Sequence, residues 1–120
     1  MKTVAALTVC LLASCAGLPP ASSSSLVGEW RYADKIQACH YVFDPNGTFH
    51  GDVVYHGKTI SKFTGRWSVK RDFLLYAYTG DTLNRIPAGA TDQDRLLRVE
   101  QESFIIEAAD GSRRKYLRVR

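Results

Sequence analysis

Three kinds of side chain in this 120-residue sequence could do chemistry, namely the cysteines, the histidines and the carboxylates. The histidines are His40, His50 and His56, and neither an HExxH pattern nor a carboxylate at ligand spacing accompanies them. A serine nucleophile of the GxSxG or SxxK type is also missing. The carboxylates are scattered along the chain. We therefore expect a protein that is not an enzyme and that needs no metal and no other cofactor.

The N-terminal residues have the pattern of an export signal. Lys2 precedes the apolar run Val4–Ala13, which is too short to cross the ~30 Å hydrocarbon core of a bilayer. The stretch Leu12-Ala13-Ser14-Cys15 resembles the bacterial lipobox. The resemblance implies cleavage between Ser14 and Cys15, followed by attachment of acyl chains such as palmitate to Cys15. The alternative is an ordinary secretory signal that is cut at or shortly after Ser14, with Cys15 as an incidental thiol.

This interpretation divides the chain into a signal peptide (1–14), an acylated tether (15–25) and one domain (26–120). The tether is rich in Ser and Pro, so it cannot bury enough apolar area to offset the entropy of ordering. Each buried acyl methylene contributes ~0.8 kcal/mol, so two or three chains give a lasting anchor. Ala16 stands where an Asp tends to retain lipoproteins at the inner membrane. The resemblance therefore favours the periplasmic side of a Gram-negative outer membrane.

Charge and cysteine usage narrow the possible partners. The formal net charge of +4 is a mild excess, and together with the envelope address it argues against a nucleic-acid partner. After cleavage before Cys15, Cys39 is the cysteine that remains without a lipid or a partner. We expect Cys39 to be a buried, inert thiol, because free cysteine is among the most buried residue types. An exposed redox-active thiol or an intermolecular disulfide is the alternative.

The domain is predicted to be all-β. Short runs rich in Val, Ile, Tyr, Phe and Trp alternate with turn signals such as Asn46-Gly47, His56-Gly57 and Asp110-Gly111. Short turns favour antiparallel pairing of consecutive strands, and closure removes exposed edges. We therefore predict a small antiparallel up-and-down β-barrel, with a β-sandwich as the second choice. The expected strands are eight: 27–33, 39–44, 48–55, 59–70, 73–79, 95–100, 104–108 and 113–119.

Two Gly-x-Trp motifs point to a family. Gly28-Glu29-Trp30, the hairpin Tyr41–Phe49 and Gly65-Arg66-Trp67 resemble the motifs of small bacterial lipocalin-like domains. That resemblance extends over nearly all of 26–120. It implies that an Arg of the last strand covers the indole of Trp30 and closes the barrel base, a role for Arg118 or else for Arg114 or Arg120. This chain is shorter than full lipocalins, so ligand-binding residues are not carried over.

The last strand carries a dense run of basic residues. Strand alternation places Arg114, Tyr116, Arg118 and Arg120 on one face, with Leu117 and Val119 on the other. We predict that the apolar pair faces the core and that the arginine face is solvated. An attraction of that face to anionic lipid, glycan or an acidic partner is the alternative.

These observations favour a lipid-anchored binding module for a small apolar or amphipathic ligand. Side chains are expected to fill most of so small a barrel. The alternative function is an envelope interaction protein, an inhibitor or assembly factor, that contacts a protein partner. Its contact surface would be the outer face or the long connection 80–94, which contains Asp81, Pro87 and Gly89.

Overall fold

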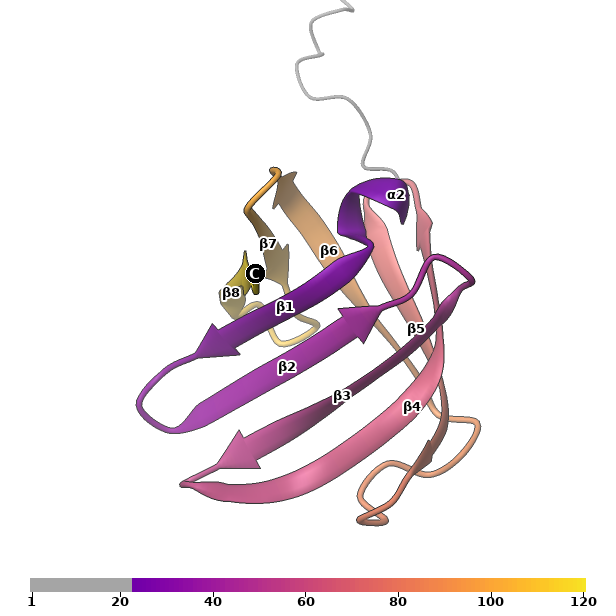
Figure 1. Ribbon diagram of the computed structural model, residues 1–120, viewed down its shortest axis with the longest axis vertical. Helices are drawn as coiled ribbons and strands as arrows, with labels where there is room; N and C mark the ends of the chain where they lie inside the picture. Colours follow the sequence, from indigo (N-terminus) through magenta and orange to yellow (C-terminus); the bar gives the residue numbers. More distant parts are fainter. Residues whose placement is uncertain (1–22) are drawn as a thin grey trace, which may run out of the picture.

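The structure is a computed structural model that describes residues 23–120. One helical turn, α2, precedes eight strands (Figure 1). Among the described residues no helix is long and apolar enough to cross a membrane. The elements are α2 (Ser23–Leu26), β1 (Gly28–Ala33), β2 (Gln37–Phe43), β3 (Thr48–Tyr55), β4 (Lys58–Lys70), β5 (Phe73–Asp81), β6 (Thr91–Val99), β7 (Ser103–Glu107) and β8 (Arg113–Arg118).

The eight strands form one closed antiparallel barrel. Each strand pairs with the next along the chain, and β8 returns to pair with β1. The predicted up-and-down barrel is therefore confirmed, and the β-sandwich is excluded. Tight turns produce this order because Gly47, Gly57 and Gly111 adopt positive φ angles of 92°, 78° and 86°. All three lie in the turns that the sequence predicted.

We name the two ends of the barrel by what lies there. The barrel base is the end that carries α2, the start of β1 and the end of β8 (Figure 1). The barrel rim is the opposite end, formed by the turns at 34–36, 56–57 and 108–112 and by the loop 82–90. This division matters because the interior residues change in chemical character from base to rim.

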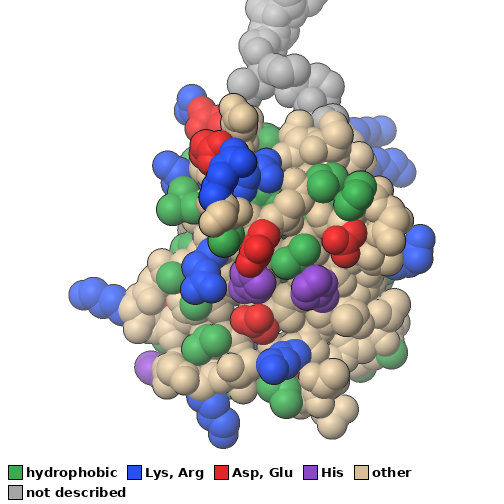
Figure 2. Space-filling view, in the orientation of Figure 1, with side chains coloured by type: hydrophobic (Ala, Val, Ile, Leu, Met, Phe, Trp, Pro, Cys, Tyr) green, Lys and Arg blue, Asp and Glu red, His purple; other side chains and the backbone are tan. Residues whose placement is uncertain are grey.

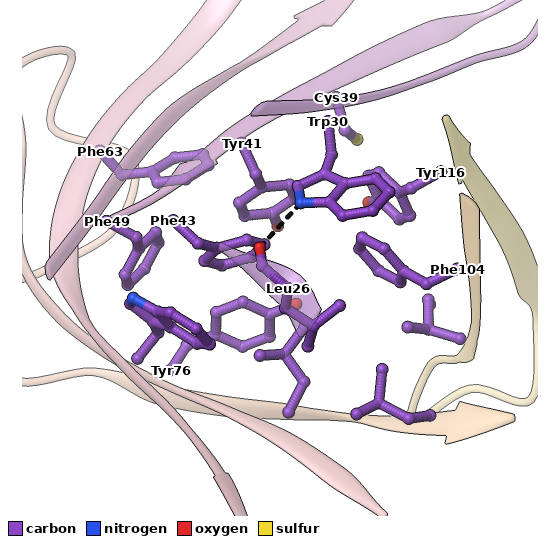
Figure 3. Packing of buried hydrophobic residues seen from close by; sticks show 14 of the residues in the cluster. Leu26, Trp30, Cys39, Tyr41, Phe43, Phe49, Phe63, Tyr76, Phe104 and Tyr116 are labelled. Atoms are coloured by element: carbon purple, nitrogen blue, oxygen red, sulfur yellow. Dashed lines mark hydrogen bonds between the residues drawn. The ribbon is translucent and has the colours of Figure 1, made fainter. Parts of the chain in front are cut away.

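The interior is filled largely by aromatic rings (Figure 3). They point inward because side chains alternate between the two faces of each strand. In β4, for example, Ser61, Phe63, Gly65 and Trp67 are buried and the residues between them are exposed. Ten of the fifteen buried cluster residues are aromatic, which confirms that side chains fill most of the barrel. The cluster comprises Leu26, Trp30, Cys39, Tyr41, Phe43, Phe49, Phe63, Trp67, Leu74, Tyr76, Tyr78, Leu96, Phe104, Ile106 and Tyr116.

Gly65 makes room for this packing in the middle of β4. A Cβ atom there would lie 2.4 Å from the carbonyl oxygen of Ala77 and 2.7 Å from the ring of Phe49. The register also shifts between Thr64 and Gly65, where β4 bends against β5. The second Gly-x-Trp motif therefore lets an aromatic ring lie directly against the backbone.

Residues 23–25, which the sequence pattern assigned to the tether, form the helical turn α2 together with Leu26. The bounds of the long connection were predicted wrongly. The long connection was expected over 80–94, but β5 runs on to Asp81 and β6 begins at Thr91. β6 begins early because Thr91 and Asp92 pair with β5, and β5 runs on because Gly80 and Asp81 pair with β4. Local sequence patterns of polar residues do not reveal this pairing.

The orientation of β8 was also predicted wrongly. Its two faces were separated correctly, but the side that carries Tyr116 faces the interior, whereas Leu117 and Val119 are 55% and 37% exposed. Tyr116 stacks on Phe104 with the ring centroids 4.9 Å apart. Burying the large ring of Tyr116 and placing Arg118 over Trp30 stabilises the barrel more than burying the smaller side chains of Leu117 and Val119 would.

Candidate functional site at the barrel rim

At the barrel base, Arg118 closes the interior. Its guanidinium carbon lies 4.1 Å from the ring centroid of Trp30, while its nitrogens donate to the carbonyl oxygens of Val27 (2.9 Å), Gln101 (2.7 Å) and Ser25 (3.2 Å). Of the three arginines that the lipocalin resemblance suggested for this role, Arg118 is therefore the one that covers Trp30. Because Arg118 and these carbonyl groups satisfy one another, this contact stabilises the closed base.

Both tryptophans of the Gly-x-Trp motifs are fixed at this end. Trp30 Nε1 donates to the carbonyl oxygen of Leu26 at 2.9 Å, which places the buried Leu26 beneath the core (Figure 3). Trp67 Nε1 donates to the carbonyl oxygen of Asp44, also at 2.9 Å. Gly28, with φ of 134°, leaves space that a Cβ would take from the Arg118 guanidinium. These residues therefore act together to close the base.

Toward the rim, the interior becomes polar. We call this group the rim cluster. Tyr76 donates its hydroxyl to Asp94 Oδ2 at 2.8 Å, and its ring stacks on that of Tyr78 with the centroids 6.2 Å apart. The rim cluster comprises Cys39, Tyr41, Tyr76, Tyr78, Asp94, Arg114 and Tyr116. Its members come from β2, β5, β6 and β8, so only the closed barrel brings them together.

Arg114 lies at the edge of the rim cluster. Its guanidinium lies 5.7 Å from the ring centroid of Tyr32, and its charge interacts with Tyr116. Arg114 is partly buried, whereas its neighbours Arg113 and Lys115 are exposed. The rim therefore presents one inward cation, one inward carboxylate and several phenol hydroxyls in a mainly aromatic surrounding.

Burial sets the acid–base behaviour of the rim cluster. Burial raises the pKa values of Tyr41, Tyr76 and Tyr116 well above the ordinary phenol value, so these hydroxyls stay neutral. Burial also raises the pKa of Asp94, against the opposing effect of the hydrogen bond from Tyr76, and the charge of Asp92 adds to the rise. The rim cluster therefore places neutral tyrosine hydroxyls beside Asp94, whose raised pKa favours the protonated carboxyl.

Cys39 lies on the inner face of β2 within this cluster. It is 3% exposed, and burial raises the pKa of its thiol. The expectation of a buried thiol is confirmed. Because the neutral thiol is a poor nucleophile, the structure gives Cys39 a packing role.

Asp81 anchors the loop 82–90 to the rim. Its carboxylate accepts hydrogen bonds from the hydroxyl of Ser61 and from the backbone N–H groups of Lys62 (2.9 Å), Leu83 (2.8 Å) and Ile86 (3.2 Å). Desolvation acts to raise the pKa of Asp81, but these four hydrogen bonds together outweigh it and lower the pKa. The loop is therefore held in one position beside the rim cluster.

The histidines are not members of the rim cluster. Figure 2 shows two His side chains together on the face formed by β1 to β3, with acidic side chains beside them. His40 Nε2 lies 2.5 Å from Glu29 Oε2, and Nδ1 lies 3.5 Å from Asp52 Oδ2. Within residues 23–120, no group of three or more His, Cys, Asp or Glu side chains is placed to hold a metal ion. His40 therefore contacts two carboxylates on the outer surface, an arrangement that sequence spacing did not reveal.

The sequence reasoning missed most of the rim cluster. Asp94 was placed at the end of a loop, although Asp92, Asp94 and Leu96 share the parity of an inward-facing strand. That alternation is the signal that could have found it. The predicted lipidation and cleavage residues, Cys15 and Ser14, lie outside the described residues.

The comparisons with known proteins agree with this geometry. A lipocalin-like protein from Bacteroides uniformis, known from its crystal structure, superposes with a TM-score of 0.60. The two chains are 17% identical, and the match covers 79% of this chain and 99% of the other. The protein therefore has a lipocalin-like fold. No protein-family profile and no curated protein matches the sequence.

Proposed function

We propose that the protein is a non-catalytic binding module for a small amphipathic ligand, carried on a lipid anchor in the cell envelope. The observation that carries the binding proposal is the contrast between the two barrel ends. The base is closed by mutually satisfied groups, whereas the rim presents Asp94, Arg114 and tyrosine hydroxyls beside aromatic rings. A ligand with an aromatic or acyl part and a polar group matches that combination.

The filled interior favours an amphipathic ligand over a purely apolar one. Tyr41 and Tyr76 are 9% and 4% exposed, and their rings stack with centroids 5.7 Å apart across the centre of the barrel. A long apolar molecule would have to displace these rings. A ligand that rests on the rim needs to displace only solvent, while its polar group reaches Asp94 or Arg114.

The anchor rests on Leu12-Ala13-Ser14-Cys15 and the short apolar run before it. In an envelope-containing bacterial host, Cys15→Ala should abolish incorporation of labelled palmitate and release the protein from the membrane fraction. Persistent labelling of the variant would contradict acylation at Cys15. Localisation to the periplasmic side of the outer membrane is part of the same proposal, and membrane fractionation of the wild type tests it.

The ligand proposal is tested by NMR on the mature chain. Lysophospholipids with zwitterionic and anionic headgroups and a single-chain alkylamine would be titrated against the labelled protein. We expect saturable shift changes at Tyr116, Arg114 and Asp94 and a loss of affinity of about tenfold, or ~1.4 kcal/mol, in Asp94→Asn or Arg114→Gln. Arg113→Gln is the matched control, because Arg113 precedes Arg114 but is exposed on the outer face. Equal losses in Arg113→Gln and Arg114→Gln would argue against the rim.

A second function is favoured by the loop 82–90. Leu83 is 46% exposed at the rim, and Asp81 holds this loop in place through its backbone hydrogen bonds. A fixed loop with an exposed apolar side chain suits contact with a protein partner, as an inhibitor or assembly factor would make. Crosslinking of the anchored protein in whole cells, with Leu83→Ser as the comparison, tests this alternative.

A further inference from the structure

The seam between β1 and β8 is the weakest closure of the barrel. β1 pairs with β2 along all six of its residues, but it pairs with β8 only at Trp30↔Arg118 and Arg31↔Leu117. Toward the rim, β1 and β8 continue without further pairing. The outer surface of this seam therefore differs from the regular sheet around it.

Apolar and cationic side chains gather on the outside of this seam. Leu117 and Val119 are 55% and 37% exposed, and Arg31 lies directly opposite Leu117 in the register. Together with Lys115 they line a shallow groove of about 350 Å³. We call Arg31, Lys115, Leu117 and Val119 the seam patch. Two exposed aliphatic side chains flanked by two cations form an amphipathic surface.

Arg31 and Lys115, the cations of the seam patch, are not neutralised by a carboxylate of the described residues, whereas several neighbouring arginines are. Arg113 is paired with Glu107 and Arg120 with Glu102. Arg31 and Lys115, by contrast, form no ion pair within residues 23–120. The nearby carboxylate of Glu29 is engaged by His40. The patch therefore presents unneutralised positive charge next to its apolar side chains.

The seam patch also lies close to the point where the described chain begins. Val119 N–H donates to the carbonyl oxygen of Glu29 at 2.8 Å, and Arg118 reaches the carbonyl oxygen of Ser25. Cys15 precedes Ser23 by eight positions, so the intervening chain spans at most ~29 Å. An acyl group on Cys15 would thus keep this side of the barrel within reach of the bilayer surface.

We propose that the seam patch docks the barrel onto an anionic lipid surface. Arg31 and Lys115 would lie at the level of the headgroup phosphates, with Leu117 and Val119 in the interfacial layer. The proposal rests on the proposed anchor for the place where docking occurs, because the tether sets the local concentration at the surface. The docking itself is a property of the barrel and is measurable without the anchor.

The test uses the mature chain with Cys15→Ala, which cannot be acylated at that position. All eight strands and the buried cluster lie within residues 26–118, so this chain keeps the whole barrel. Partition is measured by cosedimentation with vesicles of phosphatidylcholine and phosphatidylglycerol, and with phosphatidylcholine alone. We expect binding to the anionic vesicles that weakens with added salt. The double variant Arg31→Gln/Lys115→Gln should bind at least tenfold more weakly, and Leu117→Ser severalfold more weakly.

Matched controls lie at the rim. Lys35→Gln/Lys58→Gln removes the same charge from two exposed lysines at the other end, and Leu83→Ser removes an exposed leucine there. Tryptophan emission from the buried Trp30 and Trp67 verifies that each variant is folded. Equal loss in the control and patch variants would overturn the proposal, as would equal binding to both vesicle types.

Two further outcomes distinguish lipid docking from binding of an acidic protein partner and from the anchor proposal. If the chain ignores vesicles but binds a glutamate-rich peptide through Arg31 and Lys115, the patch serves an acidic protein partner and the lipid proposal is wrong. Acyl labelling of wild-type Cys15 tests the anchor separately. Labelling without vesicle binding refutes the docking alone, and vesicle binding without labelling refutes the anchor alone.

Discussion

Arg118 and Arg114 lie on the same face of β8, one at each end of the barrel, and they do different things. Arg118 covers Trp30 at 4.1 Å and donates to three backbone carbonyls, whereas Arg114 lies 5.7 Å from the ring centroid of Tyr32. At the base, the polar atoms of Arg118 and Trp30 are committed to closure. At the rim, Arg114 lies among tyrosine hydroxyls and near Asp94, a carboxyl whose pKa is raised by burial. The difference supports the proposal that the base stabilises the barrel and that the rim binds the ligand.

The largest expected effect comes from removing the ring at the base. Trp30 is fully buried, packs edge-on against Phe104 at 4.8 Å and donates to Leu26. Trp30→Ala should lower the free energy of unfolding by ~3–5 kcal/mol, measured by urea denaturation. Tyr78→Phe at the rim keeps its ring and removes one hydroxyl, so it should cost only ~1 kcal/mol. A loss for Tyr78→Phe as large as that for Trp30→Ala would break the contrast between the two ends.

A smaller effect is expected when the two arginines are exchanged for methionine. Arg118→Met removes the cation–π contact and three charged hydrogen bonds, and should cost ~2 kcal/mol of unfolding free energy. Arg114→Met should cost less than ~1 kcal/mol, because the contact that it removes, with the ring of Tyr32, is longer and less buried. Thermal unfolding of both variants gives the order. A larger cost for Arg114→Met would place the structural closure at the rim.

The smallest effects are expected in the pH dependence of stability. Folding raises the pKa of Asp94, so its stabilising contribution is complete below the ordinary aspartate pKa of ~3.9 and is lost as pH rises through the raised value. Folding lowers the pKa of Asp81, so its contribution is present above the ordinary pKa and is lost as pH falls through the lowered value. The two carboxyls near the rim therefore act in opposite directions.

Urea unfolding midpoints as a function of pH distinguish these two carboxyls. Asp94→Asn should remove the part of the wild-type curve in which stability falls with rising pH. Asp81→Asn should remove part of the decline toward acid pH and lower stability near neutrality, because the amide cannot accept all of the hydrogen bonds that hold the loop. Parallel pH curves for the wild type and Asp94→Asn would show that Asp94 is already well solvated.

Local patterns in the sequence determined the barrel because they act through nearest neighbours. Turns such as Asn46-Gly47 join consecutive strands, and period-two alternation, as in β4, indicates which face of a strand is buried. These two rules are enough for strand order and closure. The family resemblance likewise pointed to Arg118 at Trp30, because motif positions preserve their place in the barrel. The lipobox at Cys15 is predicted from residue types alone and stays a prediction.

Only the tertiary structure decided which face of β8 is buried and which groups meet at the rim. Alternation separates Tyr116 from Leu117 but does not choose between them, because the choice depends on Phe104 and Trp30 across the barrel. Asp94 likewise becomes an interior carboxyl only when β5 pairs with it and Tyr76 donates to it. Contacts between distant strands set the energies of these groups, and no local window of sequence contains those contacts.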